Sequence, residues 1–524
     1  MISKILSATL NGIEPYLIEI EVSMQRGLPM FNIVGLPDKM INESRERIIS
    51  AIKNSNIEFP VKHIIVNLAP AFIKKENSIL DLPIAAGILA SMNIINLKDN
   101  SFNYLFVGEL SLDGSIRKVR GILPILMHAK ENNIKNIIIP YSNFGEAELV
   151  DGINLMPVHN LLEMIEKLSN NNFHYTDNAD EIYKQINNDI KFSIDFSDVK
   201  GNESAKRALE IAAAGMHNIL MTGAPGTGKT MLAKRLITIL PSLTLEEALE
   251  TTKIYSSKGL LSNKKSLITV RPFRSPHHTS SDISIVGGGR LPQCGEISLA
   301  HNGILFFDEF PEFKSNVIEA LREPLEDGYV TVSRANGTFR FPARFIFAAA
   351  MNPCPCGYLH SSKHECTCSV KQIKKYYNKI SGPILDRIDI QIEIPETNFL
   401  TESNSSSETS ADILKRVIKA HEIQVYRNKK FKNKDFYNAY LTNKELNTIA
   451  VLDDISKKLI LKAMDKLKLS PRAYFKILKI SRTIADLDNS EKILPQHISE
   501  AIQYRSLDRS SYYTNVSYPV INMK

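Results

Sequence analysis

The sequence predicts an α/β protein made of an α+β domain at the N-terminus, a central core with a parallel sheet, and a helical domain at the C-terminus. Three observations support this prediction. Strand-like and helix-like runs alternate over residues 1–168, short and almost continuous apolar runs recur between residues 219 and 351, and helical periodicity dominates beyond residue 411. A chain of 524 residues is also too long for a single hydrophobic core, so several domains are expected.

The N-terminal domain is expected to span residues 1–168, where strand-like runs at 64–68, 104–107 and 137–140 alternate with helix-like segments. A polar stretch follows, which is predicted to be a linker with at most one short helix. Further changes in composition set the remaining boundaries. They divide the chain into a linker at 169–194, a core at 195–398, a second linker at 399–410, a helical lid domain at 411–508 and a tail at 509–524.

The composition restricts where the protein acts. The sequence contains no run of about 18 apolar residues, and its first residues lack the basic start and apolar core of a signal peptide. We therefore expect a cytoplasmic protein with no membrane partner. The formal net charge of +7 is compatible with a polyanionic partner but is too weak to establish one.

Residues 223–230 form the glycine-rich stretch GAPGTGKT, between a predicted strand at 219–221 and a predicted helix that follows it. In this context the backbone N–H groups surround phosphate oxygens, Lys229 reaches the β- and γ-phosphates, and Thr230 offers a hydroxyl group to Mg²⁺. The sequence thus predicts ATP and Mg²⁺ as cofactors. The residues expected to bind the nucleotide are Gly223, Ala224, Pro225, Gly226, Thr227, Gly228, Lys229 and Thr230.

An acidic pair follows a second apolar run, at 303–307, which predicts a strand buried on both faces. Ligands gather at the carboxyl ends of parallel strands, so Asp308 can hold Mg²⁺ and Glu309 can orient or deprotonate the attacking water. A third apolar run ends at Asn352, which is suited to contact the γ-phosphate or that water. The alternative role for Asn352 is to cap a turn at the strand end.

Two arginines are candidates for completing the site. Arg387 is expected to stabilise the charge on the transferring phosphoryl group, and such an arginine often comes from a neighbouring subunit. Its alternative role is a salt bridge with Asp386 or Asp389. Arg472 follows Ser470 at a predicted helix start, where the helix dipole disfavours a cation unless an anion is near. Its alternative is an exposed surface charge.

Four of the five cysteines, Cys354, Cys356, Cys366 and Cys368, lie within fifteen positions. In a cytosolic chain such a cluster suggests a metal before a disulfide. Four thiolates could close a tetrahedral structural Zn²⁺ site, although C-x-C spacing is less typical than C-x-x-C. The alternative is a set of reduced, partly buried thiols.

The segment between the acidic pair and Asn352 predicts an amphipathic helix at 313–323, ended by Pro324 and Gly328, and then a β-hairpin with Asn336-Gly337 at its turn. Basic residues near this hairpin and the preceding insertion are candidates for contact with a DNA backbone, with solvated loops as the alternative. They are Arg271, Arg274, Arg290, Arg334, Arg340, Lys258, Lys264 and Lys265. The pair His277-His278 is interpreted as structural or linked to the nucleotide rather than as a metal site.

Five further stretches complete the pattern, FNIVGLPD at 31–38, RPFRSPHHT at 271–279, GEISLAHNG at 295–303, MNPCPCG at 351–357 and IADLD at 484–488. With the motifs above, they make the chain resemble magnesium-chelatase-like AAA+ ATPases, most closely the ComM/YifB family, from near residue 1 to about 507. The resemblance implies a hexameric ATPase ring. It also implies a helicase that acts on single-stranded or branched DNA and promotes branch migration during homologous recombination of incoming DNA.

The same resemblance implies roles for individual residues. The stretch DFSDVKG at 195–201 resembles the AAA+ entry that wraps the adenine, so Val199 and Gly201 are expected in the adenine pocket. Asn352 resembles the first sensor of these ATPases, and Arg472 resembles the second sensor in their lid domain.

The N-terminal domain resembles the proteolytic domain of Lon-type enzymes. Their chemistry needs a serine nucleophile and a lysine base, but the two positions fall on Ile79 and Leu123. A register shift would restore Ser78 without restoring the lysine. We therefore interpret the domain as non-catalytic. The alternatives to a DNA motor are a ring that remodels a protein partner without gripping DNA, and an active Lon-like protease.

Overall fold

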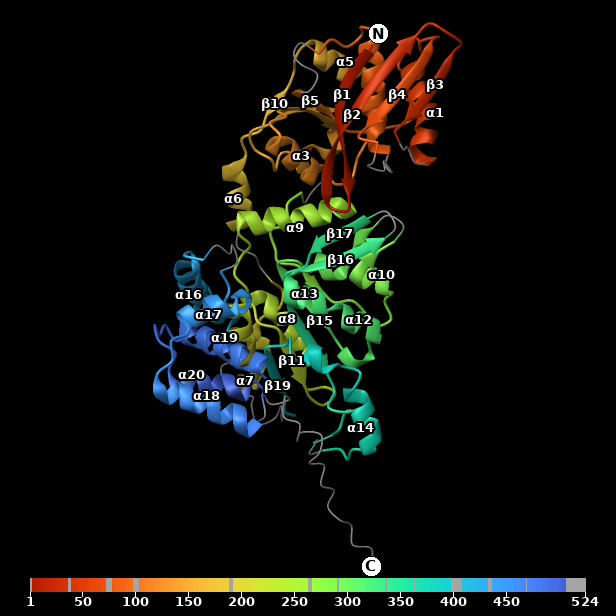
Figure 1. Ribbon diagram of the computed structural model, residues 1–524. Coiled ribbons are helices and arrows are strands. Elements are labelled where there is room, and N and C mark those ends of the chain that lie inside the picture. The colour runs from red at the N-terminus through yellow and green to blue at the C-terminus, as the bar shows by residue number, and fades with distance from the viewer. Residues whose placement is uncertain are drawn as a thin grey trace, which may run out of the picture. The chain divides into compact units, whose positions relative to one another are not determined.

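The structure, a computed structural model, describes most of the chain (Figure 1). The described residues are 2–35, 39–71, 78–97, 103–187, 192–262, 266–289, 292–334, 337–359, 361, 363–396, 408–431, 436–467 and 469–505. The tail predicted at 509–524, most of the linker predicted at 399–410, and the candidates Lys264, Lys265 and Arg290 lie outside these residues.

Residue contacts divide the chain into two compact units. The first contains Met1–Asn188, Thr244–Thr269 and Leu291–Gln293, and the second contains Asp189–Leu243, Val270–Arg290 and Cys294–Lys524. The segment predicted as a single core at 195–398 is thus shared between the units, because residues 244–269 make their contacts with the N-terminal part of the chain.

The first unit contains an eight-stranded sheet in the order β10-β9-β8-β5-β1-β2-β4-β3. The strands predicted at 64–68, 104–107 and 137–140 are confirmed as β4, β5 and β8. Alternate residues of β2 from Ile18 to Met24 are buried, so one face of this strand packs on the core. The strands are β1 Ile2–Asn11, β2 Glu14–Gln25, β3 Met30–Val34, β4 His63–Ala69, β5 Tyr104–Phe106, β6 Glu109–Leu110, β7 Ile116–Arg117, β8 Asn136–Pro140, β9 Asn154–Val158 and β10 His174–Tyr175, and the helices are α1 Lys39–Asn54, α2 Asp81–Ser91, α3 Ile122–Glu131, α4 Phe144–Ala147, α5 Leu161–Ser169 and α6 Ala179–Asn187.

Part of the stretch predicted as a linker at 169–194 is folded onto the first unit. Strand β10 pairs antiparallel with β9. The Thr176 hydroxyl group donates to the Val150 carbonyl at 2.7 Å and accepts from the Ile153 N–H at 3.2 Å. The polar composition of this stretch hid a short edge strand, because only two residues join the ladder.

Helix α9, Leu245–Lys258, belongs to the first unit and packs against α3. Thr244 and Glu247 form a capping box at its start, an arrangement that stabilises a helix by about 1 kcal/mol. At its other end the Ser256 carbonyl accepts from the Gly121 N–H at 3.0 Å, and the Ser256 hydroxyl donates to Glu146. These bonds explain why a segment that directly follows the central core in sequence leaves it.

The second unit contains a five-stranded parallel sheet in the order β12-β15-β18-β11-β19. All five residues of β15 and all seven of β18 are buried, as their apolar sequences predict. Two small ladders, β13 with β14 and β16 with β17, lie outside this sheet. The strands are β11 Ile219–Thr222, β12 Phe273–Arg274, β13 Gly287–Gly288, β14 Gln293–Cys294, β15 Gly303–Phe307, β16 Tyr329–Arg334, β17 Gly337–Pro342, β18 Phe345–Met351 and β19 Ile390–Glu393.

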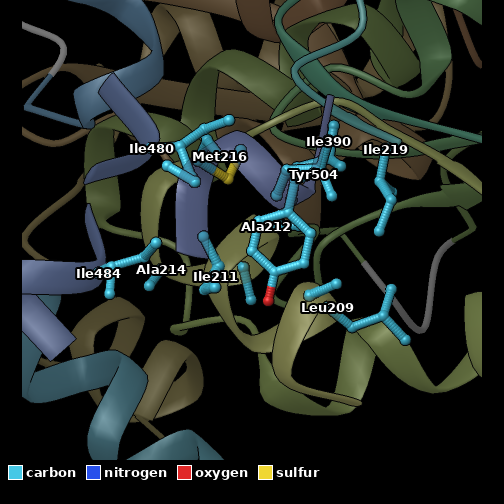
Figure 2. Packing of buried hydrophobic residues seen from close by; sticks show 14 of the residues in the cluster. Leu209, Ile211, Ala212, Ala214, Met216, Ile219, Ile390, Ile480, Ile484 and Tyr504 are labelled. Carbon is cyan, nitrogen blue, oxygen red and sulfur yellow. The ribbon is translucent and has the colours of Figure 1, made fainter. Parts of the chain in front are cut away.

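The C-terminal helices of the second unit pack on the alanine-rich helix α7, as Figure 2 shows for Ala212 and Ala214 beside Ile480 and Ile484. Small side chains on α7 allow α16 and α19 to approach it closely. The predicted start of α19 is confirmed, since the Ser470 side chain accepts from the Ala473 N–H. The helices are α7 Glu203–Gly215, α8 Lys229–Arg235, α10 Asp282–Val286, α11 Glu296–Leu299, α12 Ser315–Ala320, α13 Arg322–Asp327, α14 Val370–Tyr377, α15 Gly382–Leu385, α16 Ser410–Asn428, α17 Asn443–Ile449, α18 Asp454–Leu467, α19 Pro471–Leu487 and α20 Pro495–Gln503.

One expectation about this unit is wrong in detail. The helix predicted at 313–323 and ended by Pro324 consists of two short helices, α12 and α13. Pro324 lies in the first turn of α13, where a missing N–H costs little, and Gly328 ends that helix with a φ of +75°. The hairpin predicted next is confirmed, because β16 and β17 pair antiparallel from Tyr329 with Pro342 onward. In the described part of the chain, no helix is both long enough and apolar enough to cross a membrane.

Candidate nucleotide-binding site

The glycine-rich loop at 223–230 lies between β11 and α8, at the carboxyl edge of the parallel sheet. Gly226 and Gly228 have φ values of +79° and +87°, in the left-handed region that side chains disfavour. Pro225 and Gly226 are exposed to solvent, whereas Lys229 is buried. A loop of this conformation at the strand-to-helix turn is the type that cradles a phosphate group.

Lys229 is held inside the loop by three acceptors. Its Nζ atom donates to the carbonyl oxygens of Gly223 at 2.7 Å and Ala224 at 2.8 Å, and to Oδ1 of Asn352 at 3.2 Å. Burial lowers the pKa of Lys229 from its usual range, and the charge of Asp308 opposes this shift. Phosphate oxygens of a nucleotide would compete with the two carbonyls for the same ammonium group.

The loop and the acidic strand end meet at Thr230 and Asp308. The Thr230 hydroxyl group donates to Oδ2 of Asp308 at 2.7 Å, although the two residues are 78 positions apart. They approach because β11 and β15 flank β18 in the same parallel sheet, so their carboxyl ends share one edge. A hydroxyl and a carboxylate oxygen are hard donors, which fits Mg²⁺.

Glu309 has an unusual conformation for a residue with a side chain. Its φ is +51°, its N–H donates to Oδ1 of Asp308 at 3.0 Å, and its side chain is exposed. Left-handed conformations of such residues cost about 1–3 kcal/mol and cluster at functional sites. Oε2 of Glu309 lies 3.5 Å from Nδ1 of His278, whose ring packs against that of His277. The sequence did not predict this partner for Glu309, although it did suggest a link between the histidine pair and the nucleotide.

Asn352 follows β18, and its neighbour Met351 pairs with Thr222 at the end of β11. Asn352 and Gly223 therefore leave adjacent strands at the same level, which explains the bond from Lys229 to Oδ1 of Asn352. Within the described residues, the side chain of Asn352 makes no hydrogen bond that would cap a turn.

The segment expected to enclose the adenine is tied to the helix that starts at the loop. Arg235, the last residue of α8, donates to the Asp195 carbonyl at 2.6 Å and to Oδ2 of Asp198 at 2.7 Å. Val199 is buried in the core of the second unit, and Gly201 has a φ of +66°. The structure thus links Val199 and Gly201 to the loop through Arg235.

Arg387 is bound within its own subunit by a partner that the sequence did not suggest. Its guanidinium forms an ion pair with Glu326, at the end of α13, and donates to the Pro383 carbonyl at 2.7 Å. The expected alternative, a salt bridge with Asp386 or Asp389, is therefore wrong. No motif marks Glu326, which lies 61 residues earlier in the chain.

Arg387 and Arg472 line one cavity of about 600 Å³ in the second unit, and none of its described lining residues belongs to the glycine-rich loop. Lys479 also lines this cavity, and burial lowers its pKa to about 8. Asp389 pairs there with Lys476, and despite burial the nearby Lys476 and His217 hold the pKa of Asp389 well below its usual range. The cavity is thus lined with cations that sequence motifs alone did not bring together.

The structure separates the basic candidates for DNA contact. Arg271 is buried and donates to the carbonyl oxygens of Pro241 and Asn302 at 2.6 and 2.8 Å, so its role is structural. Arg274 pairs with Glu296. Arg334 and Arg340 are exposed on the β16–β17 hairpin and remain candidates.

The four clustered cysteines, Cys354, Cys356, Cys366 and Cys368, come together in the second unit, with all four sulfur atoms within 4.8 Å of one another. Four thiol donors in this arrangement are compatible with structural zinc.

The first unit places apolar side chains where the Lon-type chemistry would need its two catalytic residues. Ile79 and Leu123 are both buried. Ser78, the residue that a register shift would recruit, donates its hydroxyl hydrogen to the Glu109 carboxylate. No described lysine is hydrogen-bonded to Ser78, so the serine lacks the base that this chemistry requires.

Models of three parts of one protein, the magnesium chelatase subunit ChlI, match this chain. They cover residues 20–143, 195–405 and, for the ChlI C-terminal part, 407–505. The competence protein ComM of Haemophilus influenzae is 44% identical over 504 residues, which cover 95% of this chain and 96% of that protein. The chain belongs to the ComM/YifB family of magnesium-chelatase-like AAA+ ATPases.

A second member of the ComM/YifB family, YifB of Salmonella typhimurium, is 42% identical over 500 residues, again 95% of this chain and 96% of that protein. Lon protease 2 of Bacillus subtilis is 26% identical over 182 residues, which cover 30% of this chain and 32% of that protein. The predicted fold class is thereby confirmed, with a Lon-like N-terminal domain, an AAA+ core and a helical C-terminal domain. Membership in this ATPase family also implies ATP and Mg²⁺ as cofactors.

Proposed function

We propose that this chain is an ATP-driven DNA motor, a hexameric helicase that promotes branch migration during homologous recombination of incoming DNA. The observation that carries the ATPase part is the meeting of the glycine-rich loop with two strand ends, where Lys229 contacts Asn352 and Thr230 contacts Asp308. Such a meeting of loop, acidic residue and polar strand end is what phosphoryl transfer to water requires.

Each residue of this cluster has a distinct role in the proposed hydrolysis. The loop and Lys229 hold the phosphates, while Thr230 and Asp308 hold the Mg²⁺ ion that neutralises charge on the β- and γ-phosphates. Glu309, exposed at the same strand end, orients the attacking water and accepts its proton. Asn352 positions the γ-phosphate or that water, and Val199 and Gly201 contribute to the adenine pocket.

Arg387 and Arg472 are proposed to act on the nucleotide of an adjoining subunit. Support comes from the cavity that both arginines line without any described residue of the loop in their own subunit. A ring of identical subunits joined head to tail can bring this cavity to a neighbour's phosphates. Arg387 must then exchange Glu326 for the transferring phosphoryl group, since its guanidinium is paired with that carboxylate.

The DNA part of the proposal has two supports. Arg334 and Arg340 are exposed on a hairpin, where they can neutralise backbone phosphates without reading bases. In addition, the relative at 44% identity is named a competence protein.

A second candidate function is a ring that remodels a protein partner and never grips DNA. The specific observation in its favour is that all three matching family models are models of a magnesium chelatase subunit. The two candidates share the ATP site and differ in what stimulates it.

Displacement of a labelled strand from a branched DNA substrate separates the two candidates. The motor predicts strand displacement that requires ATP and is lost in Glu309→Gln. If the protein hydrolyses ATP but moves no strand at any salt concentration, and a protein partner stimulates hydrolysis, the remodelling function replaces the helicase.

A further inference from the structure

The sulfur atoms of the cysteine cluster have the spacing of ligands around one metal ion. Sγ of Cys354 lies 3.3 Å from that of Cys356 and 3.7 Å from that of Cys366, and the Cys356 and Cys366 sulfurs are 3.6 Å apart. Four sulfurs at about 2.3 Å from a tetrahedral Zn²⁺ ion lie about 3.8 Å from one another. A disulfide would need about 2.05 Å, so the cluster matches a metal site and not a pair of disulfides.

Backbone groups near the cluster are arranged to support thiolates. The Cys356 N–H donates to Sγ of Cys368 at 3.3 Å, and the Leu359 N–H donates to Sγ of Cys354 at 3.3 Å. Such bonds to metal ligands orient them and offset their negative charge. Cys354 and Cys368 are also buried, and four sulfur donors complete a tetrahedron, so the site is closed and structural.

We propose that Cys354, Cys356, Cys366 and Cys368 bind one structural Zn²⁺ ion, and that this ion braces a turn against the glycine-rich loop of the ATP site. Cys354 follows Asn352 by two residues, so the metal site begins directly where β18 ends.

The brace operates through Gly357. This residue has a φ of +89°, and a Cβ atom placed on it would lie 2.7 Å from both Cγ and Cδ of Pro225. The backbone of the zinc-binding turn therefore packs directly on the exposed proline of the loop. The same segment contacts the loop a second time through Asn352, which accepts from Lys229.

Two further contacts hold the turn from the other side. The buried Tyr377 hydroxyl, on α14, donates to the Pro353 carbonyl at 3.0 Å, and the Ser361 hydroxyl donates to Glu396 at 2.6 Å. Helix α14 begins with a capping box at Ser369, directly after the last cysteine. A zinc ion would thus fasten the end of β18 to the start of α14 through a segment that has no strand or helix of its own.

The first test is the metal content of the full chain purified without added metal or chelator. We expect about one zinc ion per chain by plasma mass spectrometry, and nearly none in Cys356→Ser or Cys366→Ser. Cys294→Ser, which changes the fifth cysteine, should keep its zinc and serves as the matched control. Absence of zinc from the wild-type chain, iron in its place, or full zinc retention in the two cluster variants would overturn the site.

The second test concerns the brace, which rests on the proposed ATP site. Gly357→Ala should keep its zinc but weaken binding of a fluorescent ATP analogue by about tenfold, because its methyl group displaces Pro225. Gly152→Ala is the control, since Gly152 also has a positive φ, +78°, but a Cβ atom placed on it would meet no atom closer than 3.8 Å. Normal analogue binding by both Gly357→Ala and the zinc-free Cys366→Ser would overturn the brace. Zinc content is measured independently of nucleotide, so failure of the ATP site in the wild type would leave the metal result readable.

Discussion

The hydroxyl group of Thr230 and a carboxylate oxygen of Asp308 are 2.7 Å apart, joined by a hydrogen bond. Thr230 ends the glycine-rich loop and Asp308 directly follows β15, so this contact unites the two halves of the proposed Mg²⁺ site. Glu309 comes next, in a conformation that side chains rarely adopt. The proposed chemistry depends on this meeting point.

Replacing Glu309 by glutamine should separate ATP binding from ATP hydrolysis. The amide cannot accept a proton from water, so we expect turnover to fall by roughly a hundredfold or more while the affinity for ATP changes little. Steady-state hydrolysis and equilibrium binding of a fluorescent analogue measure the two effects. Glu312→Gln is the matched control, since Glu312 is exposed three positions away and pairs with Lys379. Normal turnover in Glu309→Gln would remove Glu309 from catalysis.

The arginines of the cavity should act between subunits. Arg387→Ala should lose about a hundredfold or more in turnover, because an arginine at the transferring phosphoryl group is worth at least that much. Lys229→Ala should also be inactive. When the two variants are mixed in equal amounts, about a quarter of the interfaces pair an intact loop with an intact arginine, so activity should return.

The same mixing experiment can contradict the arrangement. If Arg387 acts within its own subunit, no mixed interface restores a complete site and the mixture stays inactive. Arg472→Ala should behave like Arg387→Ala in this test, because both residues line one cavity.

Sequence patterns predicted the elements of the ATP site well because short-range rules determine them. The loop needs its glycines for positive φ, and the strands before Asp308 and Asn352 need continuous apolar residues because both faces are buried. The hairpin and the start of α19 followed in the same way from a turn signal and a cap residue.

The features that sequence patterns did not predict depend on contacts between distant segments. Glu326 reaches Arg387 only because α13 and α15 come together, and no local pattern reports this. Helix α9 follows the core in sequence, yet bonds such as Ser256 with Glu146 assign it to the first unit. Pro324 was interpreted as a helix end, but a proline is also tolerated in the first turn of a helix.

The hairpin arginines should contribute to DNA binding and not to basal ATP hydrolysis. Replacing Arg334 and Arg340 by alanine should weaken binding to branched DNA and reduce the salt dependence of the binding constant by about two phosphate contacts. Fluorescence anisotropy over a range of salt concentrations measures both effects. Arg322→Ala removes another arginine of the same unit, one that pairs with Glu319, and should change neither. An unchanged salt slope in the double variant would exclude the hairpin from the DNA contact.

Lys479 should make the stability of the protein depend on pH in the alkaline range. Burial lowers its pKa from 10.5 to about 8, so between these values the unfolded chain binds the proton and the folded chain does not. The free energy of unfolding should therefore rise from pH 8 towards pH 10.5, by up to about 3 kcal/mol from this residue.

Urea unfolding at several pH values between 7.5 and 10 measures this rise. Lys479→Met should flatten the rise, whereas the control Lys462→Met, at an exposed position on α18, should leave it unchanged. An identical pH profile in the wild type and Lys479→Met would show that the lysine is solvated in the folded protein.

The most direct test of the central claim is the rate of ATP hydrolysis by the purified chain with and without branched DNA. The account predicts magnesium-dependent hydrolysis that branched DNA accelerates severalfold in the wild type and that Lys229→Ala abolishes. A rate that branched DNA leaves unchanged at every salt concentration would contradict the DNA motor, and a chain that hydrolyses no ATP at all would contradict the ATP site itself.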